Sequence, residues 1–156
     1  MMRIHRLLSL VLPLALAACL SGTTEPTLAT VETTTFAPAL GVNLATSTRT
    51  TSGLYYRDIT VGNGATLARG QVVGVYYDGY FPDGTRFDHR LAADATPPPA
   101  PFSFTLGSGT VIAGFDEGVT GMKIGGMRQI IIPPALAYGY QQNDVLVFNV
   151  EAISAQ

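Results

Sequence analysis

The side chains that most often carry covalent or metal chemistry are scarce in this sequence. It contains one cysteine, Cys19, and two histidines, His5 and His89, and no combination of the three has the spacing of zinc ligands. We therefore expect no metal, no cofactor, no thiolate chemistry and no histidine-based triad. The adjacent acids Asp116 and Glu117 open a predicted helix, where carboxylates interact favourably with the helix N-terminus, so we do not expect them to perform acid–base catalysis.

Length and charge exclude further classes of protein. The 156 residues have the usual size of one domain with one core. A single cysteine excludes a disulfide within the chain. Nine Lys and Arg residues against eleven Asp and Glu residues give a net charge of -2. The chain therefore lacks the basic surface that phosphate backbones require, and we expect no nucleic-acid partner.

The first 18 residues have the features of a secretory signal peptide. Arg3 and Arg6 precede an apolar run over residues 7–18, which is shorter than the roughly 20 residues that a membrane-spanning helix needs. The run ends in Leu16-Ala17-Ala18-Cys19, which resembles the lipobox of bacterial lipoproteins. The resemblance implies that the signal is removed before Cys19 and that the Cys19 sulfur carries a lipid. The alternative is ordinary cleavage after Ala18, which leaves Cys19 as an unmodified thiol.

A lipid on Cys19 would make the membrane a partner of the protein and would fix its location. Several acyl chains anchor a protein stably, whereas one chain anchors it weakly. Leu20, and not Asp, follows the cysteine, which by the same resemblance favours the outer membrane of a Gram-negative cell. We therefore expect a lipid-anchored protein of the bacterial cell envelope that faces the periplasm.

Residues 19–52 form a Thr-rich segment with few charges. Pro26 and Pro38 interrupt it, and its apolar residues are too scattered to form a helical stripe. We interpret it mainly as a tether that holds the domain away from the lipid surface. In the alternative interpretation, residues 36–40 pack locally on the domain.

From residue 53 onward, short apolar or alternating runs are separated by Gly, Pro and Asn, which indicates a mainly β domain. Phe115, Val119 and Met122 lie at helical spacing and predict one short helix over residues 112–122. Residues 91–101 contain four prolines and cannot form a central strand. The predicted strands cover residues 54–61, 71–81, 85–88, 102–106, 127–132 and 145–153. This order favours an α+β fold, in which an antiparallel sheet folds over a single amphipathic helix.

Seven sequence blocks in this region resemble the FKBP-type peptidyl-prolyl isomerases, and they occur in order at compatible spacings. The blocks are VVGVYYDG (72–79), DGTRFD (83–88), FSFTLG (102–107), VIAGFDEGV (111–119), GGMR (125–128), IPPALAYG (132–139) and LVFNVE (146–151). The resemblance implies an isomerase domain over residues 53–156, with a five- to six-stranded antiparallel sheet wrapped around one short helix.

The family's reaction is rotation about the X-Pro peptide bond, which needs no nucleophile and no metal. The resemblance thus implies a peptidyl-prolyl cis-trans isomerase that assists the folding of exported proteins. Its partners would be polypeptides that contain X-Pro bonds, and a macrolide of the FK506 type is a further expected ligand. Two other interpretations remain open: a lipid-tethered module that binds prolyl or hydrophobic peptides without catalysis, and a structural lipoprotein in which the domain is a spacer.

The resemblance also assigns a pocket. It implies catalytic roles for Tyr77, Asp88 and Tyr138, and a substrate-binding lining made by Phe87, Phe102, Phe104, Val111, Ile112, Phe115 and Phe148. Phe115 would form the floor beneath the prolyl ring, where the best-known members have Trp. Asp88 would accept a hydrogen bond from Tyr77, and the Tyr138 hydroxyl and the Ile112 amide would donate to a substrate carbonyl. Considered one by one, however, most of these aromatic residues would be core residues of a small domain.

Two segments differ from the family pattern. The connection between Gly139 and Val145 is shorter than usual and should leave one side of the pocket open. Residues 90–101 are a few residues longer than usual. They could replace the missing wall or project into solvent, with His89 as an exposed residue beside the site.

Overall fold

The computed structural model describes residues 27–139 and 144–156. In this part of the chain, seven strands form one antiparallel sheet in the order β1-β2-β6-β7-β3-β4, and β5 also pairs with β3. The strands are β1 (Thr48–Arg49), β2 (Tyr55–Thr60), β3 (Val72–Tyr80), β4 (Arg86–Arg90), β5 (Phe102–Thr105), β6 (Met127–Ile132) and β7 (Leu146–Ala155). The structure confirms the predicted α+β fold, because a single short α-helix, α1 (Ala113–Val119), packs on this sheet.

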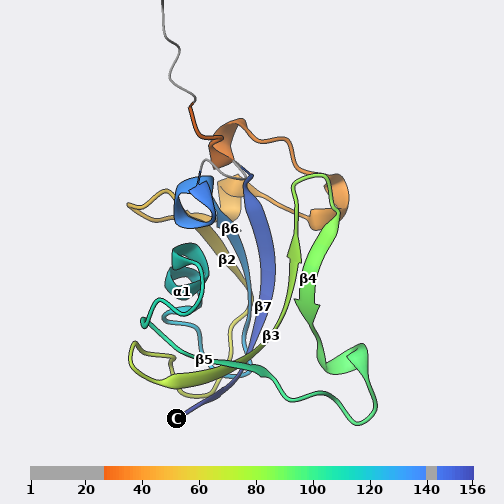
Figure 1. Cartoon of the computed structure of the whole chain (residues 1–156), viewed down its shortest axis with the longest axis vertical. Helices are drawn as coiled ribbons and strands as arrows, with labels where there is room; N and C mark the ends of the chain where they lie inside the picture. Colours follow the sequence, from red (N-terminus) through yellow and green to blue (C-terminus); the bar gives the residue numbers. More distant parts are fainter. Residues whose placement is uncertain (1–26, 140–143) are drawn as a thin grey trace, which may run out of the picture.

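The sheet curves around α1, which lies on its inner face (Figure 1). Phe115 and Val119 on α1 point into the core and are 4% and 0% exposed, which confirms this part of the predicted apolar stripe. Met122 is also buried, but it lies beyond the helix, which ends at Val119 because Thr120 has the extended values φ -58° and ψ 132°. The helix lies close to β6 because two glycines face that strand. A Cβ atom on Gly118 would lie 2.5 Å from Cγ2 of Ile130, and one on Gly114 would overlap Cγ2 of Ile132.

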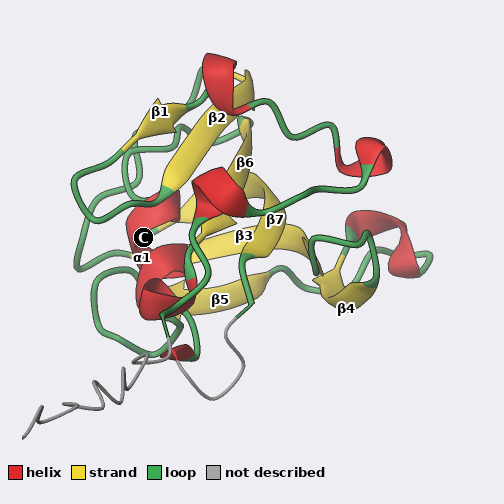
Figure 2. Cartoon of the chain, turned by 90° about the horizontal axis from the view of Figure 1, so that it is seen from above, coloured by secondary structure: helices red, strands yellow, loops and turns green. Residues whose placement is uncertain are grey.

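Strands β4 and β5 share one edge of β3. Residues 72–75 of β3 pair with β5, and residues 77–80 pair with β4. The Pro-rich residues 91–101 connect the two strands as a loop that contains the 3₁₀ helix η4 (Ala92–Asp94). Figure 2 shows β1 and β4 at opposite edges of the sheet, so β4 has β3 as its only neighbouring strand among the described residues.

A tight turn joins β3 to β4, as Pro82, Asp83 and Gly84 predict. The Thr85 amide donates to Oδ1 of Asp83 at 2.8 Å, and Gly84 has φ +91°. Positive φ is the conformation that glycine adopts without strain. The turn directs β4 back along β3 and thereby brings Phe87 and Asp88 to the inner face.

The structure does not show the predicted tether from residue 27 onward. Residues 27–52 instead lie against the domain, and they form the 3₁₀ helices η1 (Val31–Thr33), η2 (Pro38–Leu40) and η3 (Leu44–Thr46) followed by β1. Val31 and Leu40 are 1% and 9% exposed and pack in a second apolar cluster on the outer face of the sheet. The helices η1 and η2 each bury one apolar side chain and η3 buries none, so the segment has no periodic stripe that sequence analysis could detect. The sheet therefore begins at Thr48, and the alternative of local packing over residues 36–40 describes the structure better.

Three further predictions lie outside the described residues. They are the signal over residues 1–18, the lipid site at Cys19 and the start of the tether. Within residues 27–139 and 144–156, the model contains no helix with the length and apolar character needed to cross a bilayer.

The contact between α1 and β6 gives a direct test of what positions the helix. We expect Gly118→Ala to lower the free energy of unfolding by about 1–3 kcal/mol, because the added methyl group has no room above Ile130. Denaturant unfolding measures this cost. In an Ile130→Ala background the same substitution should cost much less, and an equal cost in both backgrounds would contradict the proposed contact.

Candidate functional site

A cavity of about 450 Å³ opens on the inner face of the sheet, beside the N-terminus of α1. Its lining residues are mainly aromatic and aliphatic. They are Tyr77, Phe87, Asp88, Phe102, Thr110, Val111, Ile112, Phe115, Tyr138 and Phe148. Nine of the ten residues that the sequence predicted for the site therefore surround one cavity. The tenth, Phe104, lies outside the lining, and Thr110 is an additional member.

Each part of the cavity comes from a different element. Tyr77 lies on the inner face of β3, where alternate residues Val73 and Val75 are fully buried in the core. Phe102 and Phe148 come from the neighbouring strands β5 and β7, and Phe87 comes from β4. The lining is thus assembled from side chains that are up to 71 positions apart in sequence.

Phe115 forms the floor of the cavity. It is 4% exposed, and its ring meets those of Phe148 and Tyr77 edge to face, with centroids 5.1 Å and 5.7 Å apart. Phe87 closes one wall against Phe148 at 5.5 Å, also edge to face. Edge-to-face pairs have a preferred geometry and stabilise the rings beyond the effect of burying their area. The cavity therefore has an aromatic base with defined ring orientations.

Phe104 supports this floor from below. It is 6% exposed, its ring centroid lies 5.8 Å from that of Phe115, and it stacks on Phe102 at 5.6 Å. Alternation along β5 places both residues on the inner face, but only Phe102 reaches the cavity. For Phe104 the core interpretation is therefore the correct one.

Two polar side chains meet at the side of the cavity. The Tyr77 hydroxyl donates to Oδ2 of Asp88 at 2.8 Å, and Oδ1 of Asp88 accepts from the His89 amide at 2.8 Å. Burial, as the largest cause, together with the hydrogen bond to Asp88 and the charge of that carboxylate, raises the pKa of Tyr77 from 10.0 to about 12. Tyr77 therefore remains a neutral hydrogen-bond donor at every physiological pH.

Tyr138 and Ile112 stand at the mouth. Tyr138 follows the 3₁₀ helix η5 (Pro134–Leu136) and is 51% exposed. Ile112 is the residue before α1, with an extended backbone at φ -57° and ψ 143°, and its carbonyl accepts from the amides of Phe115 and Asp116. Tyr138 and Ile112 thus border the opening.

The acids at the start of α1 have structural roles. Asp116 is 6% exposed, and its Oδ1 accepts from the Gly107 amide at 2.6 Å. This bond fixes the connection from β5 that carries Thr110, Val111 and Ile112. Glu117 accepts from the Ser52 hydroxyl at 2.7 Å. Neither acid lines the cavity.

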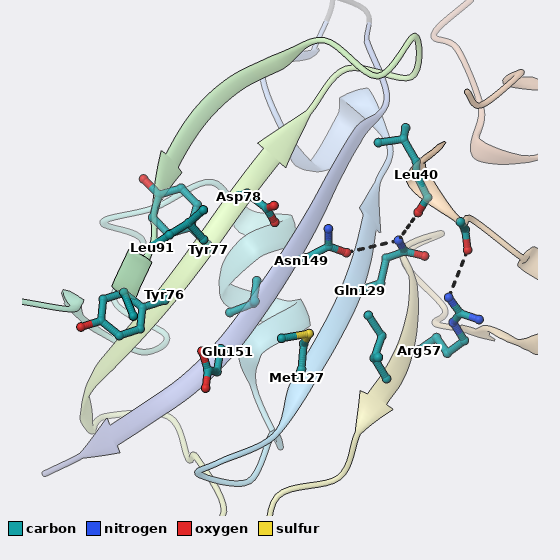
Figure 3. A pocket seen from close by; sticks show the side chains of 14 residues that line it. Leu40, Arg57, Tyr76, Tyr77, Asp78, Leu91, Met127, Gln129, Asn149 and Glu151 are labelled. Carbon is teal, nitrogen blue, oxygen red and sulfur yellow. Dashed lines mark hydrogen bonds between the residues drawn. The ribbon is translucent and has the colours of Figure 1, made fainter. Parts of the chain in front are cut away.

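The long loop does not replace a wall of the cavity. None of residues 91–101 lines it, whereas Leu91 and Ala92 line a separate cavity of about 420 Å³ on the outer face of the sheet (Figure 3). His89 is exposed, and its Nε2 lies 3.8 Å from Asp94. The shortened connection at residues 140–143 lies outside the described residues. Over the part of the chain that the model describes, no three His, Cys, Asp or Glu side chains gather as metal ligands would.

Comparison with known proteins agrees with this geometry. The family model of the FKBP-type peptidyl-prolyl cis-trans isomerases matches residues 64–153. FK506-binding protein 4 of Rhizopus delemar is 41% identical over 114 residues, which are 69% of this chain and 28% of that protein. FK506-binding protein 3 of Candida albicans is 41% identical over 108 residues, which are 65% of this chain and 24% of that protein. The chain thus spans about a quarter of the length of these curated relatives.

Solved structures show the same fold. FkpA from Escherichia coli superposes with a TM-score of 0.62 at 32% identity, over 71% of this chain and 52% of FkpA. AtFKBP13 superposes with a TM-score of 0.62 at 30% identity, over 70% of this chain and 98% of AtFKBP13. The family model covers more than half of the sequence and includes every residue that lines the aromatic cavity. The chain therefore belongs to the FKBP-type peptidyl-prolyl cis-trans isomerase family.

Proposed function

We propose that this chain is a peptidyl-prolyl cis-trans isomerase that assists the folding of exported proteins by rotating X-Pro bonds in its aromatic cavity. The observation that carries the proposal is the cavity over Phe115, with one hydrogen-bonded hydroxyl–carboxylate pair, Tyr77 and Asp88, at its side. Its volume lies in the range of pockets that enclose small ligands. A prolyl ring is compact and apolar, and it fits a floor of aromatic rings.

The physical basis of catalysis is removal of water from the peptide bond. The barrier to rotation is ~18–20 kcal/mol, and it arises from a resonance form that places negative charge on the carbonyl oxygen. Water stabilises this planar, charge-separated form more than the twisted form. A dry cavity disfavours the planar ground state relative to the twisted one, and this selective effect lowers the barrier. The apolar lining, with the rings of Phe115 and Phe148 at 4% and 5% exposure, supports a poorly hydrated floor.

Individual side chains then have distinct roles. Phe115 supports the prolyl ring, and Phe87 and Phe148 enclose it from the sides. The Ile112 amide and the Tyr138 hydroxyl donate to a substrate carbonyl at the mouth. Tyr77 holds the Asp88 carboxylate beside the ring. Rotation about the X-Pro bond transfers no proton, so the proposed mechanism needs no general base.

A second candidate function is binding without catalysis. The observation in its favour is that residues 91–101 supply no wall, so the described cavity is open at its mouth beside the half-exposed Tyr138. The same cavity would bind prolyl peptides, and we also propose that it accepts a macrolide of the FK506 type, as the names of the curated relatives suggest.

Refolding of a protein that is limited by a trans-to-cis proline step separates the two functions. We expect the chain to accelerate this step and Phe115→Leu to reduce the acceleration at least tenfold, because leucine fills the floor without offering a flat ring. Phe115→Ala should abolish prolyl binding, although its cost of about 3–5 kcal/mol makes a folding check by circular dichroism necessary. Tyr76→Phe on the outer face is the matched control. If the folded wild-type chain does not accelerate this proline step, the catalytic function is refuted and binding without catalysis remains.

The Tyr77–Asp88 pair predicts a pH profile. Because the folded-state pKa of Tyr77 is raised from 10.0 to about 12, its hydrogen bond persists as pH rises through 10 and is lost only near 12. We expect isomerisation by the wild type to stay constant between pH 8 and about 10 in a peptide assay. Tyr77→Phe should lower the rate several-fold at all these values. The raised pKa would be contradicted if the isomerisation rate of the wild type declined around pH 10. In that case the decline should disappear in Tyr77→Phe and remain in Tyr138→Phe.

We also propose that the protein is anchored by lipid on Cys19 in the bacterial outer membrane and faces the periplasm. The support is the sequence Leu16-Ala17-Ala18-Cys19 after an apolar run that is too short to span a bilayer.

This anchor is tested by expressing the full chain in a Gram-negative host. We expect the wild type in the membrane fraction, with the mass of a triacylated N-terminal cysteine. The Cys19→Ser variant should lose the lipid and leave that fraction. A variant that stays membrane-bound without the thiol would refute the anchor.

A further inference from the structure

The Thr-rich residues 31–49 cross the outer face of the sheet, and we call them the brace. They lie outside the part of the chain that the family model matches, whereas the cavity lies entirely within it. Figure 1 shows the brace running past the end of the β3–β4 hairpin. Its contacts connect the two edges of the sheet.

At one edge, the brace is fixed to β2 and to its own last residues, which form β1. Oε1 of Glu32 accepts from the Tyr55 hydroxyl at 2.9 Å and from Nε of Arg49 at 3.0 Å. A backbone hydrogen bond, followed by those from Tyr55 and Arg49, lowers the pKa of Glu32 to about 2, so the carboxylate stays charged at neutral pH. Val31 beside it is buried in the outer apolar cluster.

The middle of the sheet holds the brace at a second point. The Leu40 carbonyl accepts from Nε2 of Gln129 at 2.8 Å, and the Gly41 carbonyl accepts from Nη2 of Arg57 at 3.1 Å (Figure 3). Gln129 is 2% exposed, and its Nε2 also donates to Oδ1 of Asn149. Leu40 itself is buried. These contacts immobilise the chain on both sides of residue 37.

Between these two points, the brace reaches the opposite edge. The Ala37 amide donates to the Pro82 carbonyl in the β3–β4 turn at 2.7 Å. A Cβ atom on Gly84 in the same turn would lie 3.3 Å from the Ala37 side chain. In the described chain, β4 has one neighbouring strand, and four of its five residues are exposed. Within the sheet, β4 is held on one side only, by β3. The brace therefore gives the end of the β3–β4 hairpin a second contact.

The turn in contact with the brace also fixes a wall of the cavity. The Phe81 amide donates to the Thr85 carbonyl at 2.9 Å, and the Phe81 ring packs on Phe87 with centroids 4.9 Å apart. Phe87 lines the cavity, and the next residue along β4 is Asp88. A chain of direct contacts thus runs from Ala37 through Pro82 and Phe81 to Phe87.

We propose that the brace is a positioning element for the aromatic cavity, and that Ala37 acts through its amide to hold the β3–β4 hairpin and with it Phe87 and Asp88. The proposal rests on the proposed function only for the identity of the ligand. It implies that the working unit of this protein begins near residue 31, ahead of the family-matched segment.

The decisive variant is Ala37→Pro in the full chain. It removes the amide donor and places the proline Cδ where the amide hydrogen points at the Pro82 carbonyl, so the brace loses its contact with the turn. The observed φ of -59° already suits proline, so the backbone conformation of residue 37 itself is retained. Ala37→Ser keeps the amide and is the matched control. Leu67→Ala, a core substitution away from the brace, controls for general loss of stability.

Hydrogen exchange reports on the hairpin without any ligand. We expect Ala37→Pro to speed exchange of the Phe81 and Gly84 amides about tenfold, in line with the loss of one backbone hydrogen bond, and to leave the Ile130 and Ile131 amides unchanged. Leu67→Ala should show no such selectivity. Unchanged exchange at the hairpin in Ala37→Pro would overturn the proposal.

The effect on the site is read from a short peptide that contains one Ala-Pro bond. We expect Ala37→Pro to raise its Kd, and the KM of isomerisation, about three- to tenfold with kcat unchanged, because the floor at Phe115 is untouched. A loosened hairpin with unaltered Kd would also overturn the proposal. If the wild type binds the peptide without isomerising it, the proposed catalysis fails while the Kd and exchange measurements still decide the role of the brace.

Discussion

The structure depends on how closely α1 approaches β6. Two glycines on one face of the helix, Gly114 and Gly118, allow this approach. As a result the Phe115 ring lies at the base of the cavity and does not fill it. Strand β6 must then be apolar on the same face, and Ile130 and Ile132 are both fully buried. The cavity exists because the helix lies deep in the curve of the sheet. Bulkier residues at these two helix positions would lift Phe115 into the space above it.

The chemistry of the site follows from the same arrangement. A reaction that only rotates a bond needs a suitable environment and not a reactive group, and the rings around Phe115 supply an apolar one. The polar pair at the side has a defined geometry because the Tyr77 hydroxyl donates to Asp88 at 2.8 Å, and the raised pKa of Tyr77 preserves this donor as pH rises through 10. The scarcity of histidine and cysteine in the sequence is therefore consistent with the proposed mechanism.

Much of the fold could be predicted because each main element has a simple periodicity. Alternation in residues 71–81 corresponds to β3, and the spacing of Phe115 and Val119 corresponds to α1, although the helix ends before Met122. The ordered sequence blocks predicted ten site residues, and nine of them line one cavity in the structure. Phe104 could not be distinguished from Phe102, since alternation gives the face of a strand but not the depth of a side chain. The brace was missed because Val31 and Leu40 are buried singly, by 3₁₀ turns that leave no repeat in the sequence.

The pairing of β4 and β5 along one edge of β3 has a consequence for how this protein can vary. Both strands are held by β3 independently, so the connection between them, residues 91–101, carries no part of the inner lining. Its length is free of the constraints that fix the rest of the domain, since closing a longer flexible loop adds little entropy cost. This loop is therefore a natural site of insertion, where evolution or protein engineering could graft a docking peptide or a whole module onto the domain.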